Sequence, residues 1–301
     1  MWKKIQQNFR DNWQLYVLVL PAFVYVFLLN YIPMFGVQIA FKDFRTSKGI
    51  WESPWTGLEN FQRFISYPDF WKIVGNTLSI TLYSLATFPI AVFVALQMNE
   101  LRNERYKKVV QMVSYAPHFI STVVICAMVK LFFDRGNGIV NHIIEALGGD
   151  RISFLSEPKY FASLYVWSGV WQSVGWNTII YLSALSGIPT DLYEAADIDG
   201  ANRLQVIWNI NIPSIMPTVL TLFILSCGSL MSLGFEKVYL LQNSLNMDAS
   251  QVIATYVYEI GLLNGKYSYS TSIGLFNNTV NILMMLLVNT ISKKVANMDV
   301  I

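Results

Sequence analysis

The sequence predicts an all-α integral membrane protein with six transmembrane helices. Of its 301 residues, 54% are hydrophobic and only 13% are charged, whereas soluble globular proteins carry about 25% charged residues. Six stretches are also long and apolar enough to cross a bilayer, which takes a helix of roughly 20 residues. We expect these spans at about 14–40, 75–98, 109–133, 161–185, 215–240 and 273–292.

The first apolar stretch has an alternative interpretation as a cleaved signal peptide. Its apolar run is longer than the core of a signal peptide, however, and no cleavage site of small residues follows it. We therefore expect a retained span that is kinked at Pro21 and Pro33.

The composition excludes several other classes of protein. A net charge of +2 gives no basic field for nucleic acid. Cys126 and Cys227 both lie in apolar runs, which is typical of buried hydrophobes rather than of a disulfide framework. His118 and His142 are too few and too far apart to predict a His-based metal site, so we expect no bound metal.

Basic residues in the short segments predict the orientation in the membrane. These residues are Lys3, Lys4, Arg10, Arg102, Arg105, Lys107, Lys108, Lys293 and Lys294. An even number of spans puts all of them on one side, which the positive-inside rule assigns to the cytoplasm. We therefore expect a multi-pass protein of the plasma membrane with both termini in the cytoplasm and with external loops at 41–72, 134–160 and 241–272.

The spans divide the chain into three parts. Residues 1–74 are expected to hold the cytoplasmic N-terminal tail, the first span and the first external loop. Residues 75–292 are expected to form a five-helix core that contains the cytoplasmic loop 186–214, and residues 293–301 a cytoplasmic tail.

The loop after the fourth span, which reads GIPTDLYEAADIDGANRLQVIWNINIPSIMPT, is more than a connector. Thr190 or Asp191 is expected to cap a helix that begins near Leu192 and that Gly200 ends. A second amphipathic helix is expected to follow, and Pro213 with Pro217 to end it and start the fifth span. Two short helices in this arrangement would form a knob suited to a groove on a partner.

This loop resembles the EAA motif of ABC-importer permeases, EAA-x3-G-x9-I-x-L-P. The matching residues are Glu194, Ala195, Ala196, Gly200, Ile210, Ile212 and Pro213, with Ile212 in place of leucine. The run EAADIDGA is similar to the form found in carbohydrate importers, in which Asp199-Gly200-Ala201 is usual. NTLSITLYS (76–84) and YAPHFISTVV (115–124) resemble segments of oligosaccharide permeases of the LplB type.

The resemblance implies a MetI-like permease fold and a bacterial importer of several subunits. In this family a second permease completes a heterodimer, two cytoplasmic ATPase subunits dock on the EAA helices, and an external sugar-binding lipoprotein delivers an oligosaccharide. ATP and magnesium would then bind to the partner ATPase, with no cofactor on this chain, and the chain itself would not be an enzyme.

The resemblance also implies roles for single residues. Glu194 would make a polar contact in the ATPase groove, and Ala195, Ala196 and Ala201 would keep the backbone close to it. Asp199 and Gly200 would form the turn between the two helices. Ile210, Ile212 and Pro213 would fix the knob to the membrane domain. For each residue the alternative is a local role in stabilising its helix.

The chain lacks a phosphate-binding loop of its own. Such a loop needs G-x4-G-K-[ST], so that backbone amides hold the phosphates and the hydroxyl holds magnesium. The nearest candidate, residues 261–267, has the wrong spacing and no hydroxyl after Lys266. Energy for transport must therefore come from a partner.

A sugar path is predicted near the middle of the fourth and fifth spans. Trp167, Trp171, Gly175 and Thr178 lie at helical spacing along one face, with Asn177 beside them. Met231, Gly234 and Glu236 on the fifth span are expected to face them. The alternatives are close helix packing for the glycines and a lipid-facing or core position for the tryptophans. The roles of His118, Lys130 and Glu236 stay open.

Three other functions are alternatives to a sugar permease. An ABC permease for a non-sugar solute would carry the same loop. An ion-coupled carrier would need ionisable residues at mid-membrane, and the second, fourth and sixth spans have none in their middles. An intramembrane enzyme would show H-E-x-x-H, G-x-S-x-G or clustered carboxylates, and the sequence contains none of these.

Overall fold

The computed structural model describes residue 7 and residues 10–228 and 231–296, with side chains described up to residue 290. Over these residues the chain is helical and forms no β-strand, apart from isolated bridges between Lys42 and Trp55 and between Arg45 and Gly49. The predicted all-α class is confirmed. Lys3, Lys4 and the tail 297–301, which contributed to the predicted orientation and parts, lie outside the described residues.

The chain divides into two compact units. The first comprises Met1–Tyr67 with Val257–Leu275, and the second Pro68–Tyr256 with Phe276–Ile301. The last long helix, α18 (Tyr267–Ala296), therefore contributes to both units.

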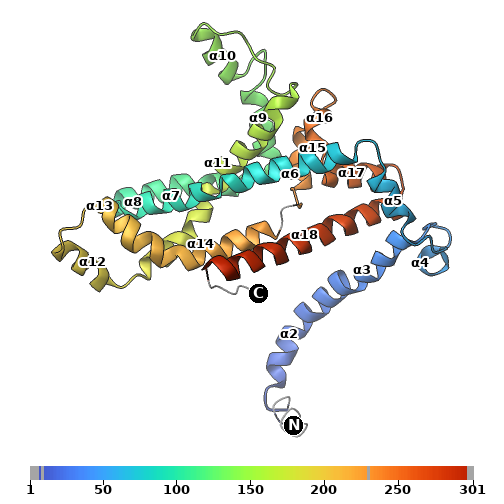
Figure 1. Ribbon diagram of the computed structural model, residues 1–301, viewed down its shortest axis with the longest axis horizontal. Helices are drawn as coiled ribbons and strands as arrows, with labels where there is room; N and C mark the ends of the chain where they lie inside the picture. The colour runs from blue at the N-terminus through green and yellow to red at the C-terminus, as the bar shows by residue number, and fades with distance from the viewer. Residues whose placement is uncertain (1–6, 8–9, 229–230, 297–301) are drawn as a thin grey trace. The chain divides into compact units, whose positions relative to one another are not determined.

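The first unit contains a 29-residue apolar helix, Trp13–Phe41, drawn in blue in Figure 1. The most apolar part of this helix has no buried residue. It agrees with the predicted span at 14–40. The helix is built from α2 (Trp13–Val26), a π-helical turn (Phe27–Tyr31), α3 (Ile32–Met34) and a 3₁₀ segment (Phe35–Phe41). The π-helical turn ends two residues before Pro33, whose missing N–H breaks the regular pattern of backbone hydrogen bonds.

Two short helices, α4 (Gly49–Glu52) and α5 (Glu59–Ile65), follow in the same unit, and Phe44 and α5 contact the start of α18. The Phe44 backbone N–H donates to Ser268 Oγ at 2.8 Å. Phe64 meets Tyr269 edge to face, and the Arg63 guanidinium lies over the Tyr269 ring.

The second unit is organised around α11 (Pro158–Ser186), a helix of 29 residues. Packed against α11 are α6 (Phe70–Ala86), α7 (Phe88–Asn99), α8 (Glu104–Tyr115), α9 (Thr122–Phe132), α14 (Ile212–Cys227), α15 (Phe235–Leu241) and α16 (Met247–Ser250). The unit also contains α10 (Ile139–Ala146), α12 (Thr190–Ile198), α13 (Arg203–Val206) and most of α17 (Ile253–Tyr258).

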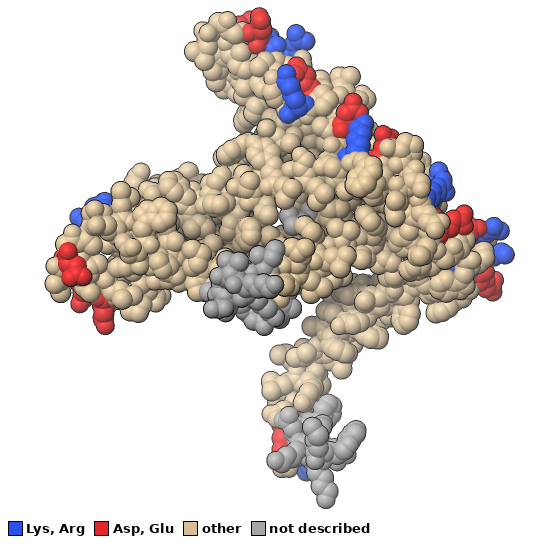
Figure 2. Space-filling view, in the orientation of Figure 1, with Lys and Arg blue, Asp and Glu red and all other residues tan. Residues whose placement is uncertain are grey.

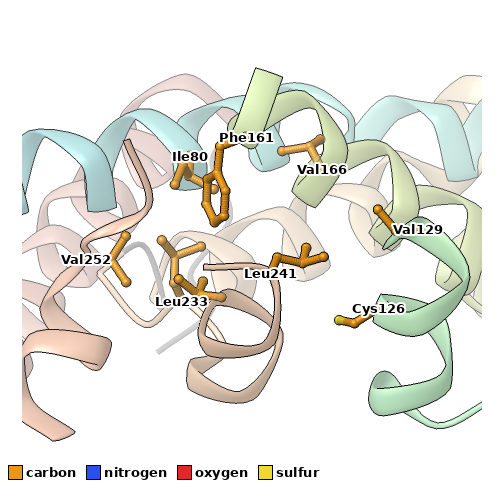
Figure 3. Close-up of a cluster of buried hydrophobic side chains, with 9 residues drawn as sticks. Ile80, Cys126, Val129, Phe161, Val166, Leu233, Leu241 and Val252 are labelled. Carbon is orange, nitrogen blue, oxygen red and sulfur yellow. The ribbon is translucent and has the colours of Figure 1, made fainter. Parts of the chain in front are cut away.

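A buried apolar cluster joins distant segments of this unit. Figure 3 shows Ile80 of α6 and Phe161 of α11 close to Leu233 and Val252 from the later part of the chain, with Val129 of α9 at the other end of the cluster, beyond Leu241. Because these side chains come from five separate segments, their burial fixes how α11 is rotated about its own axis.

Four described helices are long and apolar enough to cross a membrane: Trp13–Phe41, Phe70–Asn99, Arg203–Cys227 and Tyr267–Thr290. A fifth is added if the bent pair Glu104–Phe119 and Thr122–Phe132 counts as one span. The helix α11 has the necessary length but is less apolar, because it carries serine, glutamine and asparagine side chains.

The prediction of an unbroken third span at 109–133 is wrong. The chain bends by 98° between the helical segments Glu104–Phe119 and Thr122–Phe132. The bend occurs because Ile120 has extended backbone dihedral angles and Ser121 starts α9 as its N-cap. Gln172 of α11 donates to the Ile120 carbonyl at 2.8 Å, so a carbonyl that the bend frees is still paired.

The prediction of a continuous fifth span at 215–240 is also wrong. The helix runs from Arg203 to Cys227, starting earlier than expected, and Gly228 is its C-cap. Residues 231–234 are not helical, and α15 is a separate short helix.

Charged side chains are distributed unevenly over the second unit. On the face shown in Figure 2 they gather around α10 and at the end that carries α12, with an uncharged surface over the helices between. Because α11 runs from the α10 segment to the α12 loop, these two charged regions are separated by the length of a helix that could cross the bilayer.

Candidate functional site: a coupling loop and a polar cavity

The loop after α11 forms two helical segments with a sharp reversal between them (Figure 1). The first, α12, begins at Thr190, with Pro189 at its N-cap and no side-chain hydrogen bond there. The prediction that Thr190 or Asp191 caps this helix is therefore wrong. Pro189 occupies the N-cap with an extended backbone, φ −57° and ψ 133°, which is the non-helical conformation typical of that position.

The reversal lies at Gly200, as the sequence predicts. Its φ of +71° is in the left-handed region that side chains other than glycine rarely adopt. Asn202 then caps the second segment: its side chain accepts from the Gln205 N–H, and the Gln205 side chain accepts from the Asn202 N–H. This capping box satisfies two backbone donors locally.

The second segment does not end at Pro213, contrary to the prediction. The α13 helix continues through a π-helical turn (Ile207–Asn211) into α14, which begins at Ile212. In the π-helical turn the Ile212 N–H bonds to the Ile207 carbonyl, and this shift in the bonding pattern admits a proline at the next position without breaking the helix.

One side of the loop is anchored to the helix bundle. Ile207, Ile210 and Ile212 pack against the buried cluster of Leu96, Leu185, Ile188 and Ile215. Tyr193 Oη donates to Oδ1 of the fully buried Asn211 at 2.7 Å, which ties α12 to the π-helical turn. Of the residues expected to fix the knob, Ile210 and Ile212 make core contacts, whereas Pro213 is exposed.

The other side of the loop is open and apolar. Leu192, Ile198, Leu204 and Trp208 are exposed, and Ile198 and Trp208 keep 87% and 68% of their accessible surface. The EAA residues Glu194 and Ala195 are exposed, as are Asp199 and Gly200, while Ala196 and Ala201 are half-buried. Large apolar side chains on so short a protrusion indicate a surface that another protein covers.

The second feature is a cavity of about 740 Å³ within the second unit. Its walls come from α6, α7, α11, α14, residues 232–234 and α15. Its polar lining residues are Thr81, Ser84, Thr87, Tyr165, Gln172, Ser173, Asn177, Tyr181, Ser226, Ser232 and Lys237. Hydroxyl and amide groups of this kind can both donate hydrogen bonds to a polar solute and accept them from it.

The non-helical wall of the cavity is held in place by α18. Asn281 accepts from the Met231 N–H at 2.7 Å and donates to Ser232 Oγ at 2.8 Å. One asparagine therefore positions residues 231 and 232 after the end of α14.

The cavity contains only some of the residues expected on the sugar path. Asn177 and Gly234 line it. Trp167 and Trp171 line a different, apolar pocket of about 620 Å³ between α9 and α11. Thr178 and Met231 are buried and Glu236 is exposed, each outside the cavity lining.

Gly175 has a packing role. A Cβ atom there would overlap the Ser114 backbone carbonyl, so the missing side chain lets α11 and α8 approach closely.

Sequence reasoning missed the polar face of α11 that lines the cavity. Asn177, which was expected on the path, shares this face with Tyr165, Gly169, Gln172 and Ser173, which were not. The spacing of four residues from Tyr165 through Gly169 and Ser173 to Asn177 is visible in the sequence. The prediction was based on Trp167 and Trp171, which lie on a different face of α11. Lys237 was not expected on the path, because a single helix over 215–240 would place this residue near the end of the span rather than in its middle.

Two of the residues whose roles were open have clear positions. His118 is half-buried and stacks on Trp176, with ring centroids 4.4 Å apart. Lys130 is exposed on α9 and does not line the cavity.

The comparisons with known proteins agree with the geometry. Residues 87–297 match the family model of the "binding-protein-dependent transport system inner membrane component". The chain belongs to this family. It is 42% identical to protein LplB of Bacillus subtilis (strain 168) over 286 residues, which cover 95% of this chain and 90% of LplB. The ABC-importer permease family predicted from the EAA motif is thereby confirmed.

Further relatives are named for the transport of polysaccharides. The polygalacturonan/rhamnogalacturonan transport system permease protein YteP of Bacillus subtilis (strain 168) is 40% identical over 293 residues, 97% of this chain and 90% of YteP. A chain in the crystal structure of a bacterial ABC transporter involved in the import of the acidic polysaccharide alginate superposes with a TM-score of 0.89 at 34% identity. The match covers 97% of this chain and 99% of that one.

Proposed function

We propose that this chain is one of two permease subunits of an ATP-driven oligosaccharide importer and that it receives the force of ATP hydrolysis through the α12–α13 loop. The observation that supports this most directly is the loop itself. Its EAA sequence lies on a protrusion that is anchored on one side and apolar and exposed on the other. An ATPase subunit that binds ATP and magnesium would cover the exposed side.

Six membrane spans fit this proposal. They are the four long apolar helices, the bent pair α8–α9, and α11. The polar residues of α11 are compatible with a span, because several of them face the cavity rather than lipid.

The cytoplasmic position of the loop is supported by charge. The basic segment at residues 100–108, which includes the first turn of α8, follows α7, whose Leu96 packs with Leu185 and Ile188 beside the loop. The basic segment and the loop therefore lie at the same end of the second unit, which the positive-inside rule assigns to the cytoplasm. The α10 segment, at the other end of α11, then faces outward and can meet a binding protein.

An oligosaccharide suits both the cavity and the relatives. The cavity lies in the usual size range of small-molecule sites, roughly 300–1,000 Å³, and its hydroxyl and amide lining matches the hydroxyl groups of a sugar. One structural relative was solved in complex with a periplasmic protein that holds an alginate pentasaccharide. A second permease would close the open side of the path.

The test is co-purification of the tagged chain with the candidate ATPase. Glu194→Lys reverses a charge on the docking surface, and Gly200→Trp adds a ring at the turn. We expect both variants to lose the ATPase while keeping the second permease.

Two matched controls separate docking from folding. Asp191→Lys makes the same charge change on the same helix outside the motif, and Gly200→Asn keeps a residue that tolerates the left-handed conformation. Both should retain the ATPase. ATPase retained by Glu194→Lys and by Gly200→Trp would contradict docking at this loop.

A further inference from the structure

The cavity has a charge that its hydroxyl and amide lining does not explain. Lys237 of α15 is the one Lys, Arg, Asp, Glu or His among the described residues that line it. Its accessible fraction is 8%, so the side chain is largely removed from solvent. A buried cation is costly unless an anion or several hydrogen bonds compensate it.

The contacts of Lys237 leave this charge without an anion. Its Nζ donates to the Tyr165 carbonyl at 2.8 Å and lies 4.9 Å from the centre of the Tyr165 ring. Within the described part of the chain no carboxylate lies within 4 Å of Nζ. An ammonium group has three donors, and one carbonyl uses one of them.

The surrounding backbone leaves room for the ammonium group. A Cβ on Gly169 would come within 3.1 Å of Lys237 Nζ, so a larger residue at this position of α11 would press on it. Gly169 also lines the cavity. The ammonium therefore lies where a ligand in the cavity can reach it.

We infer that the transported oligosaccharide is acidic and that Lys237 binds one of its carboxylates in the cavity. This inference rests on the proposed function, because it names the substrate class of the proposed transport site. A carboxylate would supply the missing anion through a charge-assisted hydrogen bond. Gln172, Ser173 and Asn177, which line the same cavity on α11, are placed to bind the hydroxyl groups of such a sugar.

The charge balance favours a carboxylate over a phosphate. A phosphate carries up to two negative charges at neutral pH, and the described lining offers one cation and no arginine fork. Sugar units with a single carboxylate each, the uronic acids, match one lysine among neutral hydrogen-bonding groups.

The experiment measures uptake by proteoliposomes that contain the whole importer with its binding protein and internal ATP. The probe is a radiolabelled tetrasaccharide of uronic acid, and the reference is the same tetrasaccharide with its carboxyls reduced to alcohols. ATP hydrolysis stimulated by the loaded binding protein is measured in parallel. Because the binding protein is the same in all samples, a difference between variants belongs to the permease.

Lys237→Gln should lower uptake of the uronide at limiting concentration by about ten-fold or more, the value of a charged hydrogen bond. Lys237→Arg keeps the charge and should retain most of the uptake. Lys130→Gln removes an exposed cation outside the cavity lining and should leave uptake unchanged. The uronide should be preferred to the reduced sugar in the wild type and lose that preference in Lys237→Gln.

Three outcomes would overturn the inference. One is equal uptake of uronide by wild type and Lys237→Gln, and another is wild-type preference for the reduced sugar. The third is an equal fall for both sugars in Lys237→Gln with a lower thermal stability of the complex, which would mean that Lys237 only fastens α15 to α11. Failure of the proposed function is a distinct result, in which wild type takes up neither sugar in response to ATP.

Discussion

The α12–α13 loop and the polar cavity are built in opposite ways. The loop takes its shape from residues close together in the chain: Gly200 reverses it and the Asn202–Gln205 capping box starts its second helix. The cavity takes its shape from contacts between distant residues, such as Gly175 against Ser114 and Met231 with Asn281. Because neighbouring residues determine its shape, the loop can be recognised from a sequence motif. The shape of the cavity instead depends on how α11 is rotated about its axis.

The largest effect should come from filling the contact between α11 and α8. Gly175→Leu places a side chain where the Ser114 backbone carbonyl lies, and overpacking of this kind costs about 3 kcal/mol or more when backbone must move. We expect a large fall in thermal stability in detergent. Gly75→Ala, on a helix with nothing within 4 Å of the added Cβ, should be nearly neutral. Equal stability of both variants would mean that this contact does not fix α11.

A second effect lies where the loop meets the bundle. Tyr193→Phe removes the hydrogen bond to Asn211 Oδ1, and no partner for the buried Nδ2 is found among the described residues. An unsatisfied buried amide costs about 1–3 kcal/mol, so unfolding should require less denaturant. The double variant Tyr193→Phe/Asn211→Leu should recover part of the loss. If the double variant lost as much stability, relative to wild type, as the two single variants lose together, the two side chains would not be coupled.

The capping box provides a smaller and purely local test. Asn202→Ala should cost about 1 kcal/mol, the usual value of an N-cap, and its effect should be confined to hydrogen exchange in α13. Because the two bonds of the box are reciprocal, adding Gln205→Ala should increase exchange little further. Faster exchange along α11 as well would show that the loop is not locally determined.

The smallest effect is expected at a residue that the sequence predicted on the sugar path. Glu236 neighbours Lys237 but is exposed and outside the cavity lining. Glu236→Gln should therefore change uptake by less than about two-fold, as surface substitutions usually do. A loss as large as that of Lys237→Gln would put Glu236 back on the path.

The sequence by itself determined the helical membrane class, the family and the turn of the α12–α13 loop. Composition and apolar runs are sums over residues, and the EAA motif with its glycine acts over a few positions, so neither needs knowledge of distant contacts. Ile210 and the turn at Gly200 could be placed on this basis before any coordinate was known.

Only the tertiary structure decided the bend at Ile120, the end of α14 at Cys227, and the face of α11 that meets the cavity. The bend depends on Gln172 to pair the Ile120 carbonyl, and the wall after α14 depends on Asn281. Two neighbouring residues, Glu236 and Lys237, differ in exposure because adjacent helix positions point about 100° apart and only packing sets which one faces inward. Helical periodicity shows which residues share a face of a helix, but the close packing of distant segments decides which face points inward.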